Sequence, residues 1–147
     1  MEDVILEGNH GFSKPVIIGG GMIGCETAYR LWEDGTDVTV IEMLPDILMV
    51  GTSLIYRHAA VKKLRNTSVN IMTDASVVEI LDDGVLLADG TKVEGDKVIL
   101  AVGLRSDKTL FEELNEVVDE VYVIGDANKP GIIFHAVNDA HKIAVEL

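Results

Sequence analysis

The feature that most constrains the fold is a glycine cluster between a short apolar run and a helical pattern. Residues 15–18 (PVII) are apolar and mostly β-branched, which predicts a buried strand. The sequence GGGMIG follows at 19–24, and apolar residues then recur at helical spacing over 22–34, up to Gly35. A second β-branched strand is predicted at 38–41. Strand, glycine turn, helix and strand together predict a parallel β-α-β unit.

The rest of the sequence predicts more elements of both kinds. Aspartate-glycine pairs lie between apolar runs at 82–84 and 89–90, and such pairs favour hairpin turns because both residues tolerate positive φ. We therefore expect an antiparallel meander of three strands in the middle of the chain. The further elements expected are helices at 53–65 and 134–147, and strands at 69–72, 77–81, 85–88, around 92–93, at 97–102 and at 121–124.

Three of the glycines satisfy the pattern GxGxxG in the context that gives it meaning, between a strand and a helix. In this interpretation Gly19 makes a tight turn, Gly21 lets a pyrophosphate approach the backbone, and Gly24 lets the helix pack closely on the sheet. The helix start at Met22 and Ile23 offers unpaired N–H groups and the positive end of the helix dipole. The pattern predicts a site for a dinucleotide.

An acidic residue ends the second strand at the place where a dinucleotide-binding unit contacts the adenosine ribose. Glu42 would accept hydrogen bonds from the ribose 2′-hydroxyl and would repel a 2′-phosphate. The following segment adds Asp46 and contains no lysine or arginine before Arg57. We therefore expect NAD(H) rather than NADP(H), with the alternative that Arg57 or Lys62 folds back toward the ribose.

The fold class predicted is α/β: a Rossmann-like parallel sheet with helices and a three-stranded antiparallel β-meander, as in FAD- and NAD(P)-binding domains. Residues 1–147 are interpreted as a single dinucleotide-binding domain. Its expected parts are a leader at 1–13 with a short helical remnant at 3–6 and a loop at 7–13, a nucleotide-binding core at 14–103, and a return segment at 104–147 with a Gly-Asp motif.

The charge of the chain excludes several classes of partner. Lysine and arginine total 12 against 25 aspartates and glutamates, which gives a net charge of −13. Such a surface repels nucleic acids and anionic membranes, so neither is expected as a partner. Cys25 is the one cysteine, which excludes a disulfide within the chain, and the four histidines form no metal-ligand pattern. We expect a cytoplasmic protein with no metal site and no catalytic side chain of its own.

The sequence resembles a known family. The run VIIGGGMIGCETAYRLWEDGTDVTVIE is similar to the NAD-binding domain of pyridine-nucleotide-dependent flavoprotein reductases. It most resembles NADH:flavin oxidoreductases related to old yellow enzyme, such as 2,4-dienoyl-CoA reductase, 2-enoate reductase and trimethylamine dehydrogenase. The runs DGTKVEGDKVILAVGLRSD and VYVIGDANKPGIIFHAVNDAHKIA are similar to later motifs of the same enzymes.

The resemblance implies that the chain is part of a larger flavoprotein, whose flavin-bearing domains would be its partners. It also implies that Glu26 lies near the nicotinamide, that the Gly103 backbone approaches the cofactor, and that Asp126 faces FAD. FAD binding would require segments that this sequence does not contain. The complete set of residues expected to contact cofactor is Gly19, Gly20, Gly21, Met22, Ile23, Gly24, Glu26, Glu42, Met43, Val102, Gly103 and Asp126.

The function expected is that of an NAD(H)-binding domain, which positions NADH for hydride transfer to a flavin held elsewhere in the full enzyme. Two alternatives remain open from the sequence. The first is an FAD-binding domain that uses residues 19–24, Glu42 and Asp126. The second is a non-catalytic module that binds NAD and reports on it. Isolated, the chain is expected to bind nucleotide without catalysing a reaction.

Overall fold

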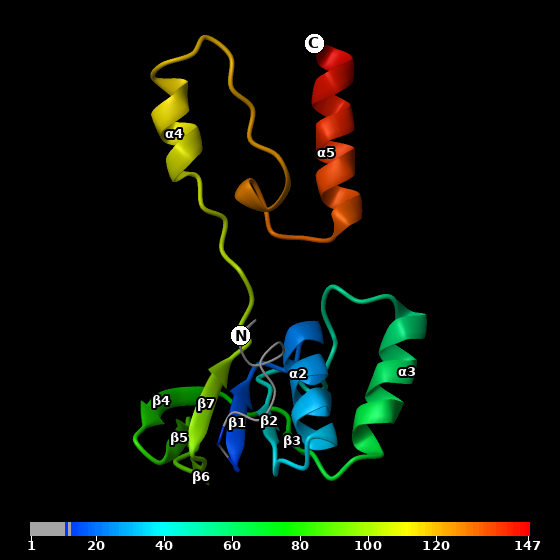
Figure 1. Ribbon diagram of the computed structural model, residues 1–147, viewed down its shortest axis with the longest axis vertical. Coiled ribbons are helices and arrows are strands. Elements are labelled where there is room, and N and C mark those ends of the chain that lie inside the picture. The colour runs from blue at the N-terminus through cyan, green and yellow to red at the C-terminus, as the bar shows by residue number, and fades with distance from the viewer. Residues whose placement is uncertain (1–10, 12) are drawn as a thin grey trace. The chain divides into compact units, whose positions relative to one another are not determined.

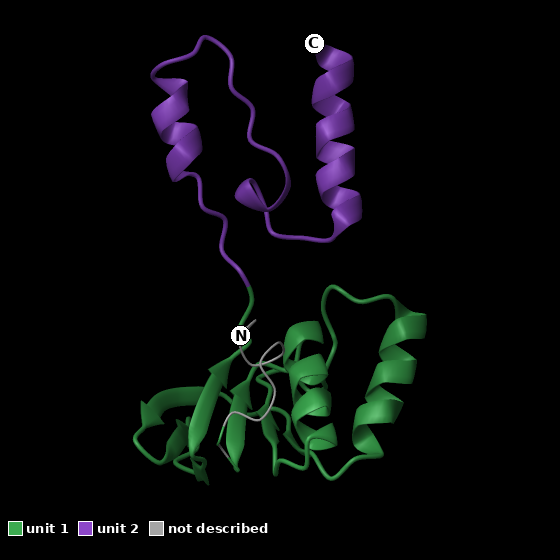
Figure 2. Cartoon of the chain, viewed as in Figure 1, with its two compact units in different colours: residues 1–103 green, residues 104–147 purple. Residues whose placement is uncertain are grey.

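The computed structural model describes residue 11 and residues 13–147 (Figure 1). The helical remnant expected at 3–6 and most of the loop expected at 7–13 lie outside the described residues. The chain divides into two compact units, Met1–Gly103 and Leu104–Leu147, which Figure 2 shows in different colours. Each unit is described by itself.

The first unit contains a parallel sheet of four strands. Its order is β3 (Asn70–Met72), β2 (Thr39–Ile41), β1 (Pro15–Ile18) and β7 (Lys97–Leu100), and every neighbouring pair is parallel. β1 lies in the interior because both of its edges are paired. The predicted parallel sheet is confirmed, although β7 ends two residues earlier than the sequence pattern indicated.

The predicted antiparallel meander is also confirmed. It consists of β4 (Val77–Leu81), β5 (Gly84–Leu87) and β6 (Lys92–Glu94), with β5 in the middle. Gly84 and Gly90 have φ angles of +145° and +87°, which explains why glycine follows aspartate at both turns.

Two helices flank the parallel sheet. α2 (Met22–Glu33) crosses from β1 to β2, and α3 (Leu54–Arg65) crosses from β2 to β3. α2 is followed by Gly35, whose φ of +83° is the left-handed conformation typical of a helix C-terminus. α3 begins after Ser53, whose hydroxyl accepts a 3.3 Å hydrogen bond from the backbone N–H of Tyr56.

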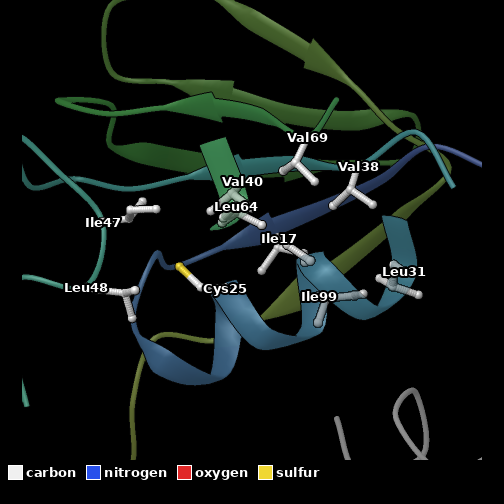
Figure 3. Close-up of a cluster of buried hydrophobic side chains, with 11 residues drawn as sticks. Ile17, Cys25, Leu31, Val38, Val40, Ile47, Leu48, Leu64, Val69 and Ile99 are labelled. Carbon is white, nitrogen blue, oxygen red and sulfur yellow. The ribbon is translucent and has the colours of Figure 1, made fainter. Parts of the chain in front are cut away.

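The two faces of the sheet bury different clusters, because successive side chains of a strand point to opposite faces. On one face Ile17 and Val40 pack with Ala28 and Leu31 of α2 and with Leu64 of α3 (Figure 3). On the other face the strands pack against the meander through Val16, Ile41, Val85 and Leu87. A strand buried on both faces is apolar throughout, which is the pattern seen in PVII.

A carboxylate fixes the start of the sheet. Asp96, just before β7, accepts hydrogen bonds from the backbone N–H groups of Ser13 (2.5 Å) and Lys14 (3.0 Å), next to β1. The Ser13 N–H, then the Lys14 N–H and the Ser13 hydroxyl, lower the pKa of Asp96, against a smaller opposing effect of burial.

Asp96→Asn is therefore expected to lower stability at neutral pH. Because the folded pKa lies below the unfolded value of about 3.9, the contribution of this carboxylate is complete above that value and is lost as the pH falls through the folded pKa. Urea titrations at a series of pH values should show a lower midpoint for the variant at pH 7 and convergence with the parent protein in acid. A gap that stays constant down to the lowest pH at which the protein folds would contradict this assignment.

The second unit contains α4 (Thr109–Asn115), the short 3₁₀ turn η1 (Gly125–Ala127) and α5 (Ile133–Glu146). The helix predicted at 134–147 is confirmed within one residue at each end. The strand predicted at 121–124 is wrong: this apolar segment has no hydrogen-bonded strand beside it within the described part of the chain. A strand is completed by a neighbour, so an apolar run cannot form one alone. α4 was not predicted.

α5 has apolar residues on one face that remain exposed, among them Ile133, Phe134, Val137 and Val145. Among the described residues, no helix has the length and apolar character that crossing a membrane requires.

Candidate functional site

The glycine turn lies at the carboxyl edge of the parallel sheet. Gly19 has a φ of +110°, and its N–H donates to the Ile41 carbonyl of the next strand at 2.8 Å. A β-carbon at Gly19 would collide with the carbonyl oxygen of Ala101, which follows β7. The tight turn predicted at this position is therefore present, and both neighbouring strands enclose it.

Gly24 brings α2 against this turn. A β-carbon there would collide with the carbonyl oxygen of Gly19 and would lie 3.2 Å from the Ala101 side chain. Only a residue without a side chain permits this approach, as the sequence pattern predicted.

The GxGxxG pattern gives no role to Gly20, and the structure supplies one. Its N–H donates to the Glu42 carboxylate at 2.7 Å. A β-carbon at Gly20 would lie 2.9 Å from the Glu42 β-carbon and 2.8 Å from Ile47. The residue must be small because two side chains of the segment after β2 pack directly on it.

Gly21 faces open space. A β-carbon at this position would meet no atom within 4 Å, and Gly21 is the N-cap residue of α2. No side chain in the described part of the chain caps this helix, and its first turn carries no acidic residue. Met22 and Ile23 are partly exposed beside it. The unpaired N–H groups and the helix dipole therefore make this corner attractive to an anion, despite the net charge of the chain.

Glu42 is buried, with 8% of its surface exposed. Its two carboxylate oxygens accept hydrogen bonds from the backbone, one from Gly20 and the other from Leu44 at 2.8 Å. A carboxylate has about four acceptor positions, so these two bonds leave capacity for a hydroxyl donor. Met43, beside it in the sequence, is exposed.

Asp46 forms a second acidic feature just beyond Glu42. Its carboxylate pairs with Arg57 at 2.6 Å and with Arg65 at 2.8 Å, and it accepts the Ile47 N–H at 2.9 Å. Burial opposes ionisation here, yet the Ile47 bond and the charges of Arg65 and Arg57 lower the pKa of Asp46. Arg57 and Lys62 were the two cations that the sequence allowed to fold back toward the ribose. Of these, Arg57 is paired with Asp46.

Glu26 lies on the face of α2 toward α3. It accepts a 2.7 Å hydrogen bond from the Tyr56 hydroxyl, and this bond, with burial and the charge of Glu26, raises the pKa of Tyr56. The pair borders a cavity of about 230 Å³ that Leu48 and Lys63 also line.

Cys25 is buried beside the glycine turn, where its thiol donates to the Gly20 carbonyl at 3.3 Å. Burial, and then the charges of Glu42, Glu26 and Asp46, raise the pKa of Cys25 to about 12. A helix N-terminus ordinarily favours the thiolate, but burial among carboxylates outweighs that effect here.

Cys25 is therefore expected to resist alkylation in the folded protein. Because the folded pKa is about 12, almost no thiolate exists at pH 8. Iodoacetamide labelling at pH 8, followed by mass spectrometry, should be at least about a hundredfold slower in buffer than in 8 M urea, where the thiol has an ordinary pKa of about 8.5. Comparable rates in the two solvents would show that the thiol is accessible.

The remaining predicted site residues lie in different places. Val102 and Gly103 follow β7 and Ala101 at the end of the first unit; both are exposed, and Gly103 has a φ of +97°. Asp126 belongs to the second unit, where it accepts a 3.1 Å hydrogen bond from the Gly131 N–H. The structure therefore gathers residues 19–24 and Glu42 in one site.

Sequence reasoning missed four residues that shape this site. They are Leu44 and Ile47, which contact Glu42 and Gly20, Tyr56, which bonds to Glu26, and Arg65, which shares Asp46 with Arg57. The bond between Leu44 and Glu42 is local, whereas the other contacts join segments whose proximity no local pattern encodes.

A parallel sheet with an open glycine turn, a free helix N-terminus and a buried acid after the next strand defines a dinucleotide-binding domain. Residues 2–140 match the family described as pyridine nucleotide-disulphide oxidoreductase. The chain therefore belongs to the pyridine nucleotide-disulphide oxidoreductase family, in agreement with the broader resemblance of its sequence to pyridine-nucleotide-dependent reductases.

Curated relatives and solved structures agree with this assignment. The chain is 32% identical to cinnamate reductase of Clostridium sporogenes, over 97% of this chain and 22% of that protein. It is 34% identical to NADH oxidase of Thermoanaerobacter brockii, over 97% of this chain and 23% of that protein. A solved structure of 2-naphthoyl-CoA reductase superposes with a TM-score of 0.82 at 29% identity, over 99% of this chain and 23% of that one. The chain thus spans less than a quarter of the length of these relatives.

Proposed function

We propose that the chain is the NAD(H)-binding domain of a flavin-dependent oxidoreductase and positions NADH for hydride transfer to a flavin held elsewhere in the full enzyme. The observation that carries the proposal is the open corner at Gly21, where the free N-terminus of α2 meets the Glu42 side of the glycine turn. The pyrophosphate would lie on the backbone N–H groups of Gly21 and Met22, and Glu42 would receive the adenosine ribose hydroxyls.

The preference for NAD(H) over NADP(H) rests on charge. A 2′-phosphate beside Glu42 would meet a buried carboxylate that is already fixed by two backbone bonds and cannot turn away. Repulsion inside a partly buried site is stronger than in water, because the local dielectric constant is lower.

The chain's own residues need only bind and orient the cofactor. Bound nicotinamide supplies the hydride, so no protein nucleophile is required. Glu26 would orient the nicotinamide end of the cofactor, and the exposed backbone at Val102 and Gly103 would lie beside it. By fixing the reacting groups in this way, a binding domain raises the rate of hydride transfer.

The parent enzyme is proposed to be of the type related to old yellow enzyme, with flavin-bearing domains as partners of this chain. The similarity to cinnamate reductase and 2-naphthoyl-CoA reductase supports that type. The exposed apolar face of α5, with Ile133 and Phe134, supports a covering domain in the parent protein. A cytoplasmic location belongs to the same proposal, since the one cysteine leaves no disulfide to form within the chain.

Calorimetric titration of the 147-residue chain tests the proposal directly. NADH should bind with measurable heat and more tightly than NADPH, and no reduction of an added acceptor should follow. Absence of heat with either nucleotide would contradict the nucleotide site, and tighter binding of NADPH would contradict the role of Glu42. Flavin absorbance in the purified chain would favour the alternative of an FAD-binding domain.

A further inference from the structure

We infer that Asp46 determines nucleotide specificity, by binding Arg57 and Arg65 and so keeping both guanidinium groups from a 2′-phosphate. This inference rests on the proposed function and adds a residue to it. Glu42 repels the phosphate directly, whereas Asp46 acts through the two arginines.

The segment that carries Asp46 lies next to the ribose side of the site. Ile47, which follows it, packs on Gly20, and the Leu48 N–H donates to the Gly20 carbonyl at 2.8 Å. The Glu42 carboxylate bonds to the N–H of the same glycine. The segment that carries Asp46 and the side chain that would hold the ribose therefore meet at one residue of the glycine turn.

The Asp46 carboxylate binds both arginines at once. Arg57 approaches one carboxylate oxygen of Asp46 and Arg65 approaches the other, so a single carboxylate bridges two positions of α3. Guanidinium groups are the side chains best suited to phosphate, because their fork matches the phosphate oxygens. With Asp46 present, a 2′-phosphate would have to compete for them with a carboxylate that is already in place.

Removing Asp46 would raise the local positive charge. The three side chains together carry a net charge of +1, and without the carboxylate the two arginines carry +2. The Arg57 side chain is 29% exposed and the Arg65 side chain is 57% exposed, so neither is enclosed by the protein. Loss of Asp46 should thus convert a region that rejects the 2′-phosphate into one that attracts it.

The test uses ADP-ribose and 2′-phospho-ADP-ribose, which differ only in the phosphate and carry no nicotinamide. In Asp46→Asn, the ratio of the two dissociation constants should shift toward the phosphorylated ligand by about tenfold or more. The matched control is Asp83→Asn, which removes the 2.6 Å ion pair with Lys92 on the meander and should leave the ratio unchanged.

Arginine variants extend the test, and Arg57→Gln alone does not depend on how well Asp46→Asn folds. Arg57→Gln in the otherwise unchanged chain should leave the ratio within about threefold, because the arginine does not yet contact phosphate. Arg57→Gln added to Asp46→Asn should remove part of the gain.

The outcomes separate the inference from the proposed function. If the unchanged chain binds neither ligand, the proposed function fails and the inference falls with it. If it binds ADP-ribose but Asp46→Asn does not shift the ratio, only the inference fails. Weaker binding of 2′-phospho-ADP-ribose in Arg57→Gln alone would also overturn the inference, since that arginine would already be a phosphate ligand.

Discussion

Replacing Gly24 with alanine is expected to destabilise the first unit by about 2–3 kcal/mol, because the added methyl group would overlap the Gly19 carbonyl. The loss should appear even though alanine favours a helix over glycine by about 1 kcal/mol. The overlapping atom belongs to the backbone of the glycine turn, so it cannot move as a flexible side chain would. Relief requires α2 to shift away from β1, which separates Ala28 and Leu31 from the sheet.

Trp32 provides the measurement, since it is the chain's single tryptophan and lies on α2. Urea unfolding followed by its fluorescence should show a lower midpoint for Gly24→Ala. Gly21→Ala is the matched control, because a β-carbon there meets nothing within 4 Å. That control should retain its midpoint but bind NADH more weakly, since the methyl group would stand where the pyrophosphate is proposed to lie. Equal stability of Gly24→Ala and the parent chain would contradict the packing described.

Replacing Glu42 with alanine is expected to weaken NADH binding by about 30-fold, the equivalent of about 2 kcal/mol for hydrogen bonds to a charged acceptor. NADPH should lose less, because the same change removes the repulsion of the 2′-phosphate. Stability should fall as well, since the N–H groups of Gly20 and Leu44 lose their partner. Each buried N–H left unpaired costs about 1–3 kcal/mol.

Asp96→Asn is the control that separates the two effects of Glu42→Ala. Asp96 also accepts two backbone N–H groups, but at the amino-terminal edge of the sheet, away from the glycine turn. It should lower stability without changing the affinity for NADH. Calorimetry at a temperature where circular dichroism shows every variant folded makes the comparison valid. Equal loss of NADH and NADPH binding in Glu42→Ala would mean that the carboxylate only supports the turn.

Much of the fold follows from local sequence. The apolar run at 15–18, the helical spacing at 22–34 and the Asp-Gly turns at 84 and 90 each correspond to an element whose ends lie within a few residues of the prediction. These signals are reliable because periodicity reports directly which face of an element is buried. The strand predicted at 121–124 failed for the complementary reason. An apolar β-branched run indicates which residues must be buried, but a strand also needs a hydrogen-bonded neighbour.

The features of the candidate site likewise separate into those that local sequence predicted and those that only the structure revealed. The sequence alone determined that Gly19 and Gly24 lie at a strand-to-helix turn and that an acid follows the next strand, because both are matters of spacing along one β-α-β unit. Only the tertiary structure decided that Gly20 supports Glu42 and that Asp46 joins Arg57 to Arg65. These contacts connect side chains from different elements, and their geometry is fixed by packing, which no local pattern specifies.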